Sequence, residues 1–327
     1  MAQRILEPGE IETLASRDVP RIILADRDSL FAARAERLRA LAATSAIGDY
    51  LQLLAVLVDA QHAQLAALRP ERLAELQSAA MAQQPPAVAA AGMPPLHAAS
   101  LARDDEWRSI LRALCRTCLE HGGFPAEAHG VLERLIAAPD AWLDAQADAV
   151  LEVPGAAAID AVTAPFVMAA LQVYWTALAL AFKPTDLAPM ADAPGLCPLC
   201  GTPPVASVVH ARAPHSSYRY LSCALCACQW HFVRVQCSHC GGVGKDIAYR
   251  ALAGIDGDEA AAARDAAVRA ETCDHCHGYR KILYLEKDPG VEPVADDLGT
   301  LALDLLLGEE GYQRVSQNPL LWQASGD

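Results

Sequence analysis

Four Cys-x-x-Cys pairs lie in close succession in the C-terminal part of the chain: Cys197/Cys200, Cys223/Cys226, Cys237/Cys240 and Cys273/Cys276. Two residues between the cysteines let one tight turn present both sulfurs to one ion, and two such turns complete a tetrahedral site. A thioredoxin-like redox motif would instead be a single pair at the start of a helix in a βαβ unit. Because these pairs alternate with strand-like segments, they predict metal sites rather than redox disulfides.

Pairing in sequence order predicts two four-cysteine sites, with 22 residues between the pairs of the first and 32 between those of the second. The first site consists of Cys197, Cys200, Cys223 and Cys226, and the second of Cys237, Cys240, Cys273 and Cys276. Both separations suit the hairpin of a zinc-ribbon or rubredoxin-like module. The alternative is an interleaved arrangement in which Cys197/Cys200 shares an ion with Cys237/Cys240. Sequence order is favoured because the 22-residue insert contains two strand-like segments of its own.

The cysteines predict two metal ions per chain but leave the metal open, since four thiolates in a tetrahedron suit zinc and a single rubredoxin-type iron alike. Zinc would make each site a closed structural centre. Iron would add redox or sensing chemistry.

Three further cysteines fall outside the two sites. We interpret Cys228 as a small strand residue beside the second knuckle, with a competing or redox-active ligand as the alternative. Cys115 and Cys118 lie one turn apart on a predicted helix without a fourth ligand in view, so we interpret them as buried helical cysteines. The histidines in or next to the knuckles are expected to face solvent: His239, His275 and His277.

Residues 1–185 are predicted to form an all-α domain. Apolar residues recur at helical spacing in the segments 28–42, 49–68, 104–121, 126–137 and 140–151. The segment 161–182 carries no charge and approaches membrane-spanning length, but it contains Pro165 and Gln172 and much alanine. We therefore interpret it as a buried central helix that begins near Pro165.

A proline-rich linker, residues 186–196, precedes two cysteine modules, residues 197–236 and 237–327. Short segments that mix β-branched or aromatic with polar residues predict strands between the cysteine pairs. Near the C-terminus, Leu298, Leu301 and Leu305 form a stripe after Asp296 and Asp297, which predicts one helix that begins at these acids. The expected fold is mostly α with small β: an all-α domain, two tandem rubredoxin-like or zinc-ribbon-like modules and a C-terminal helix.

Charge and motifs exclude several functions. The formal net charge is −14, and from Cys197 to the end 11 Lys and Arg stand against 16 Asp and Glu, which disfavours nucleic-acid binding. The sequence contains no glycine-rich phosphate loop, no G-x-S-x-G and no H-E-x-x-H, so no enzymatic activity is predicted. The N-terminus lacks a basic stretch followed by an apolar run, which makes the reducing cytoplasm the expected compartment.

Three segments together resemble the formate dehydrogenase accessory protein family: CPLCGTPPVASVV, RYLSCALCACQWHFVRVQCSHC and AETCDHCHGYRKILYLEKDPGVEPVADDLGTLALD. The likeness continues in GYQRVSQNPLLW and, more loosely, in the helical part. The family's four Cys-x-x-Cys pairs map onto the eight cysteines of the two sites. Cys228 and the pair Cys115/Cys118 depart from the family pattern, which leaves an additional redox-active thiol open.

The resemblance implies a cytoplasmic maturation factor for respiratory formate dehydrogenase, whose catalytic subunit receives a molybdenum cofactor and an iron–sulfur cluster before export. Family members look like iron-binding rubredoxin-type proteins that contact this catalytic subunit. The alternatives are a rubredoxin-like electron-transfer protein and a zinc-ribbon nucleic-acid-binding protein. A homodimer is compatible with the sequence, which does not indicate the oligomeric state.

Overall fold

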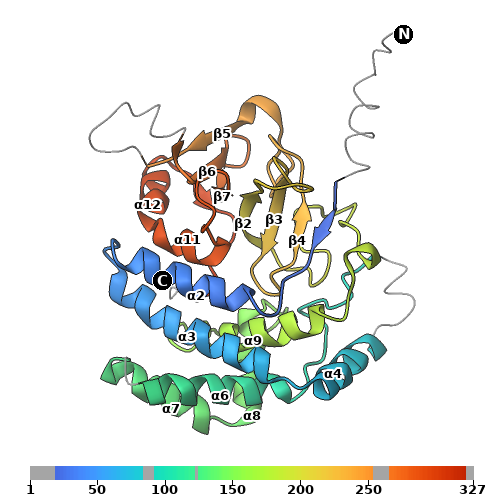
Figure 1. Cartoon of the computed structure of the whole chain (residues 1–327), viewed down its shortest axis with the longest axis vertical. Helices are drawn as coiled ribbons and strands as arrows, with labels where there is room; N and C mark the ends of the chain where they lie inside the picture. Colours follow the sequence, from blue (N-terminus) through green and yellow to red (C-terminus); the bar gives the residue numbers. More distant parts are fainter. Residues whose placement is uncertain (1–18, 84–91, 122–123, 253–264, 322–327) are drawn as a thin grey trace.

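The computed structural model describes residues 19–83, 92–121, 124–252 and 265–321. Within them, nine α-helices and one eight-stranded sheet are arranged in layers, with the sheet at one end of the molecule and α6, α7 and α8 farthest from it (Figure 1). The expected fold class is confirmed: helices come first, cysteine-bearing strands follow, and helical structure returns near the C-terminus.

The N-terminal part contains seven of these helices: α2 (Leu30–Ala42), α3 (Gly48–Ala67), α4 (Pro70–Ala82), α6 (Glu106–His121), α7 (Ala126–Ala137), α8 (Asp140–Val150) and α9 (Ala164–Ala179). In α3 the predicted stripe from Leu51 to Leu65 is buried. The sequence reading missed α4. It begins at Pro70, which lacks the N–H that would continue α3, so the two helices meet at 92°.

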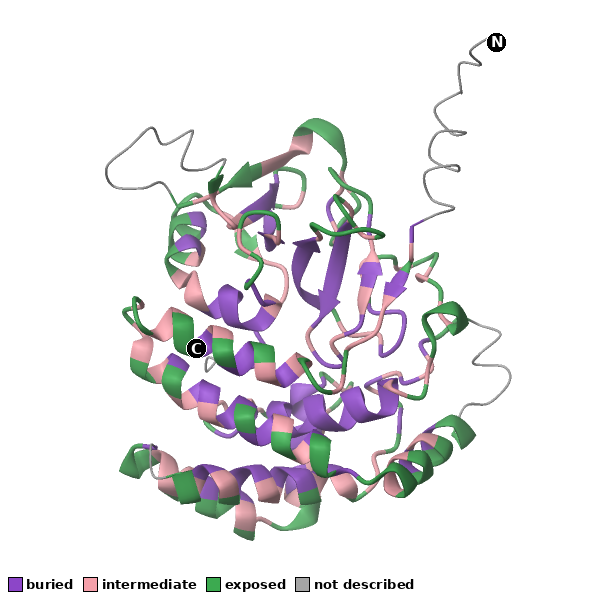
Figure 2. Cartoon of the chain, viewed as in Figure 1, coloured by how far each residue is buried: buried purple, intermediate pink, exposed green. Residues whose placement is uncertain are grey.

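Helix α9 is the centre of the helical part. Every residue of it except Pro165 is buried, and Pro165 stands in its first turn as predicted (Figure 2). Among the described helices, none is by itself long and apolar enough to cross a membrane. Only α3 and α4 taken together, across their bend, meet that test of length and composition.

The cysteine-bearing strands form two antiparallel units that join into one sheet. The strands are β2 (Pro204–Val209), β3 (Arg219–Cys223), β4 (Gln229–His231), β5 (Ile247–Arg250), β6 (Val268–Cys273), β7 (Gly278–Tyr284) and β8 (Gln313–Arg314). Parallel pairing of β2 with β7, in which Ser207 lies opposite Ile282, connects the β2–β3–β4 unit to the β5–β6–β7 unit. The sequence did not indicate this connection.

The helical part and the first cysteine unit are also joined by a strand pairing and by a common hydrophobic core. Strand β1 (Ile22–Ile23), from the N-terminal part, pairs with β4 and extends the sheet. One cluster of buried side chains runs from Leu54 in α3 and Trp175 in α9 to Leu225 and Trp230 beside the first cysteines. The domain boundaries predicted from the sequence stay predictions, but these segments do not pack as separate bodies.

The C-terminal helix differs from the prediction. It is broken at Thr300 into α11 (Pro293–Gly299) and α12 (Leu301–Glu309). Its N-cap is Glu292, whose carboxylate accepts hydrogen bonds from the backbone N–H groups of the first turn, whereas Asp296 and Asp297 are buried within α11. Leu298 is buried as expected, but Leu305 is 73% exposed, because the break turns the second half of the stripe away from the core.

Buried ion pairs attach α11 to α2, which lies against it (Figure 1). Arg34 donates to Glu292 at 2.9 Å with both side chains buried, and Arg37 donates to Asp296 at 2.6 Å. Glu292 thus caps one helix and neutralises a cation from another, 258 residues away in sequence. Removing one partner of such a pair leaves an uncompensated buried charge.

We therefore expect Glu292→Ala to lower the free energy of unfolding by about 3–5 kcal/mol, because it removes the cap and leaves Arg34 unpaired. Urea unfolding followed by circular dichroism measures the change. Asp59→Ala, which removes the exposed partner of Arg39, is the matched control and should cost at most about 1 kcal/mol. Equal losses in the two variants would contradict a stabilising role for the buried pair.

Candidate metal centres

The two cysteine pairs of the β2–β3–β4 unit come together from two turns. Cys197 and Cys200 lie in the turn before β2, Cys223 ends β3, and Cys226 lies in the turn that follows. All four are buried and their sulfurs lie within 4.8 Å of one another, with 3.6 Å between Cys197 and Cys226 and 3.4 Å between Cys200 and Cys223. We call this group the first centre.

The other four cysteines form an equivalent group in the second unit. Cys237 and Cys240 lie in a turn after β4, Cys273 ends β6, and Cys276 lies in the turn before β7. Sulfur–sulfur distances are 3.9 Å between Cys237 and Cys276 and 3.7 Å between Cys240 and Cys273. This second centre is nearer the surface, since Cys240 is exposed and Cys276 partly exposed.

The spacing of the sulfurs fits a tetrahedral metal ion. With metal–sulfur bonds of about 2.3 Å, the edges of a sulfur tetrahedron are about 3.8 Å long, close to the distances in both centres. Four cysteines leave no open coordination position, and this donor set suits zinc or a single iron. The structure groups the cysteines in sequence order, so the interleaved alternative was wrong. That all eight act as ligands stays a prediction.

All four knuckles share one backbone conformation. The residue after the second cysteine has a positive φ in each: 77° at Gly201, 78° at Gly241, 55° at Ala227 and 52° at His277. This left-handed residue closes the turn, and Gly201 accordingly donates its N–H to the Cys197 carbonyl. Glycine adopts the conformation without strain, whereas Ala227 and His277 adopt it at a cost, so the turn is imposed even where the sequence does not favour it.

Backbone and hydroxyl groups surround the sulfurs with hydrogen bonds. Cys223 accepts from the N–H of Leu225 at 3.3 Å, and Thr202 lies 3.0 Å from the same sulfur. Burial raises the pKa of Cys197, Cys200 and Cys226 well above that of an ordinary thiol. Burial acts in the same direction on Cys223, but hydrogen bonds from its neighbours outweigh it and hold its pKa well below the usual value. Loading a metal on four thiolates therefore releases protons.

The helical part holds the first centre in place through polar contacts that the sequence reading missed. Gln172 of α9 donates to the carbonyl of Ala224, inside the second knuckle, at 2.7 Å, and accepts from Gln61 of α3 at 3.0 Å. The backbone of the segment before α6 also bonds the first knuckle, from Leu96 to Leu199 at 2.8 Å. Glutamines at buried positions of apolar helices were the only available signal.

Two buried arginines hold the second centre. Arg219 of β3 donates to the carbonyls of Gln236 and Val233, just before Cys237. Arg280 of β7 donates from Nε to the hydroxyl of Ser238, inside the knuckle, at 3.0 Å. Both were overlooked in the sequence, where an arginine in a short strand reads as a solvent-facing residue.

The remaining cysteines lie where the simpler interpretations placed them. Cys228 is buried beside the first centre, and hydrogen bonds from Cys197 and Cys226 lower its pKa to about 6. Cys115 and Cys118 are buried on α6, and burial raises the pKa of Cys118 to about 12. In the part of the chain that the structure describes, no third cluster of metal-ligating side chains forms. The three knuckle histidines are exposed, as expected: His239, His275 and His277.

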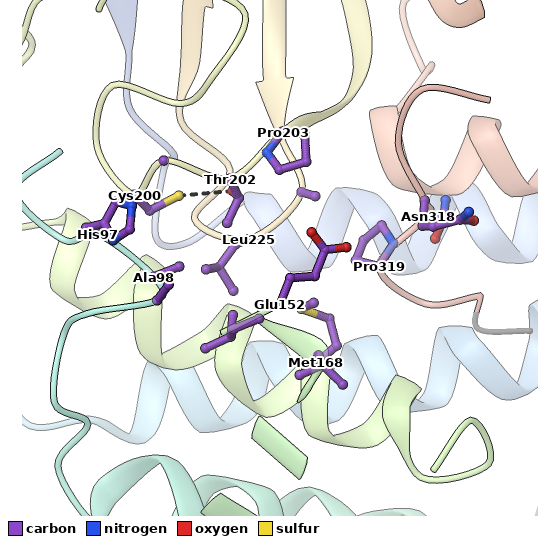
Figure 3. Close-up of a pocket in the computed structure, with 16 residues that line it drawn as sticks. His97, Ala98, Glu152, Met168, Cys200, Thr202, Pro203, Leu225, Asn318 and Pro319 are labelled. Atoms are coloured by element: carbon purple, nitrogen blue, oxygen red, sulfur yellow. Dashed lines mark hydrogen bonds between the residues drawn. The ribbon is translucent and has the colours of Figure 1, made fainter. Parts of the chain in front are cut away.

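A cavity of about 180 Å³ borders the first centre where helical, knuckle and C-terminal segments meet (Figure 3). Its wall includes Cys200 and Thr202, and its floor includes Met168 of α9 and Leu225. Figure 3 shows the side chain of Glu152 between those of Leu225 and Pro319.

We expect the purified chain to hold two metal ions bound only by sulfur. Metal analysis should give two ions per chain and X-ray absorption should show sulfur alone in the first shell. Cys276→Ser should lower the content to one ion, because three thiolates no longer close the second centre. One ion in the unaltered protein, or nitrogen or oxygen in the first shell, would refute the two-centre assignment.

We further expect Gln172→Ala to weaken the first centre alone, because the Ala224 carbonyl loses its buried donor at a cost of about 1–3 kcal/mol. A chelator competition should release one of the two ions earlier than in the unaltered protein. Gln77→Ala is the control, since Gln77 also donates to a backbone carbonyl, but to that of Ala177 within α9 and not to one in a knuckle. Equal effects of the two changes would show that Gln172 stabilises α9 and not the centre.

Comparison with known proteins agrees with this geometry. Three family models match the chain: FdhE, N-terminal, over residues 19–192, FdhE, central domain, over residues 196–234, and FdhE, C-terminal domain, over residues 235–321. The protein FdhE homolog of Pseudomonas aeruginosa is 39% identical over 331 residues, which cover 98% of each chain. Protein FdhE of Escherichia coli K12 is 37% identical over 330 residues, which cover the whole of both.

A solved structure is similar as well. The crystal structure of the FdhE protein from Pseudomonas aeruginosa superposes with a TM-score of 0.71 at 37% identity, and the match covers 93% of this chain and 99% of that one. Family models, relatives of full length and a solved fold therefore converge, and the chain belongs to the FdhE family.

Proposed function

We propose that this protein is a non-enzymatic accessory factor for the maturation of respiratory formate dehydrogenase, and that it binds the immature catalytic subunit in the cytoplasm. Membership of the FdhE family over the full chain is the observation that carries the proposal. The two closed cysteine centres agree with it, because a tetrahedral four-thiolate site offers no open position for a substrate.

A physical reason for such a factor lies in the client. A catalytic subunit that still lacks its cofactors exposes surface that the finished enzyme buries. A helper that contacts this surface binds the immature state more tightly and is released on completion. The shared core joins the first centre to the helices, and the continuous sheet joins the second centre to the first, so that the two centres and the helices can present one surface to a client.

Deleting the gene should abolish respiratory formate dehydrogenase activity while the catalytic subunit is still made. A tagged copy should capture that subunit from cytoplasmic extract when it lacks cofactor, and capture the finished enzyme at least about tenfold less, the ratio that a difference of about 1.4 kcal/mol gives. Cys226→Ser should lose capture, and Cys118→Ala, a buried cysteine outside both centres, should retain it. Unchanged enzyme activity in the deletion strain, or equal capture of both states, would defeat the proposal.

A rubredoxin-like redox role is the second candidate, and the exposure of Cys240 favours it because electron transfer needs a metal centre near the surface. Anaerobically purified protein with iron in the second centre would then show thiolate-to-iron absorption that bleaches reversibly on reduction. Protein that carries zinc in both centres and still restores enzyme activity would exclude this role.

A further inference from the structure

The surroundings of the second centre contain an excess of buried positive charge. Arg219 and Arg280 are both buried, and Glu271 is the one carboxylate buried between them. Arg219 donates to Glu271 at 2.7 Å, and Tyr249 donates to the other oxygen of the same carboxylate. Glu271 thus bonds Arg219, and it also lies opposite Arg280 across β6 and β7, so one buried carboxylate faces two buried cations.

Arg280 meets only neutral acceptors within the described residues. Its Nε donates to Ser238, and its Nη1 donates to the hydroxyl of Ser316 at 2.6 Å and to the carbonyl of Pro204. The next cation, Arg314, is balanced within a separate group that pairs two carboxylates with two cations: Asp297, Asp304, Lys281 and Arg314. The single charge of Glu271 balances only one of the two arginines, and a buried guanidinium with too little countercharge is costly, since removal from water disfavours the charged form.

The countercharge lies in the cysteine cluster. Four thiolates around a divalent ion carry two excess negative charges. Ser238, which Arg280 bonds, stands between Cys237 and Cys240, and Arg280 lines one cavity of about 450 Å³ together with these two cysteines. His275 and Asp274, which neighbour Cys276 and Cys273 in sequence, are exposed to solvent.

We infer that Arg280 is the counter-ion of the second metal centre, whose buried positive charge stabilises the four-thiolate, metal-loaded state of that centre alone. The first centre has no equivalent counter-ion among the described residues that bond its sulfurs and knuckles. Among the described residues its sulfurs and knuckles receive hydrogen bonds from backbone N–H groups, Thr202 and Gln172, all of them neutral. The two centres thus have the same ligands in different electrostatic surroundings.

The full chain, loaded with zinc, tests this inference by competition with a chelator, and cadmium NMR of the same variants assigns each loss to one centre. Arg280→Gln should lower the zinc affinity of the second centre about 10- to 100-fold, the effect typical of groups that support a metal's ligands, and leave the first centre unchanged. Arg280→Lys, which keeps the charge but not the forked hydrogen bonds, should restore most of the affinity.

A further variant separates charge from packing. Ser316→Ala removes one hydrogen bond of Arg280 without changing charge and should leave zinc affinity within about twofold of the unaltered protein, since the loss of a neutral hydrogen bond changes no charge beside the thiolates. Arg280→Lys and Ser316→Ala decide the matter even where Arg280→Gln does not fold.

The inference is overturned by either of two results. One is that Arg280→Lys binds zinc as poorly as Arg280→Gln or Ser316→Ala loses as much affinity, which would make Arg280 a structural donor. The other is that Arg280→Gln weakens the first centre as much as the second, because the charge of Arg280 would then not act on the second centre alone.

Discussion

The parallel pairing of β2 with β7 is the contact on which the rest of the molecule depends. Each cysteine unit alone is a small three-stranded sheet with two turns, and such a unit has little core of its own. Through this pairing, Val208 and Leu283 meet in the middle of one sheet, and one face of that sheet can pack on α9 and α11. Two local metal-binding units thereby become part of a single hydrophobic core.

This arrangement changes what the metal ions stabilise. In an isolated zinc finger the ion stabilises one small unit, whereas here the first centre lies within the same buried cluster as the helices. The bonds from Gln172 to Ala224 and from Leu96 to Leu199 connect the knuckles to α9 and to the segment before α6. We therefore expect loss of an ion from the first centre to affect the helical part, and loss from the second centre, at the surface, to have smaller consequences for the core.

The parts that could be predicted from the sequence are those that local rules determine. Cysteine spacing predicted both groups of four, because a two-residue turn fixes where two sulfurs point. Helical periodicity predicted α2 and α3, and an uncharged apolar segment with Pro165 near its start predicted the buried α9. The joined sheet, strand β1 and the break at Thr300 could not be predicted, because each depends on a partner far away in sequence. Gln172, Arg219 and Arg280 were missed for the same reason: a polar side chain reads as exposed until the fold shows what it meets.

Buried charge is common to the contact between α2 and α11 and to the surroundings of the second centre. The chain is acidic overall, with a formal net charge of −14, yet it buries arginine at three positions that contact a partner unit: Arg34, Arg219 and Arg280. Arg34 reaches a carboxylate that caps α11, Arg219 reaches Glu271, and Arg280 reaches Ser238 in the Cys237/Cys240 knuckle without a hydrogen bond to a carboxylate. An ordinary ion pair explains the first two. For the third, Glu271 is shared with Arg219, so we infer that the thiolates of the loaded second centre supply the further negative charge. The position of Arg280 would then favour the loaded state of that centre, which the cysteine pattern alone does not express.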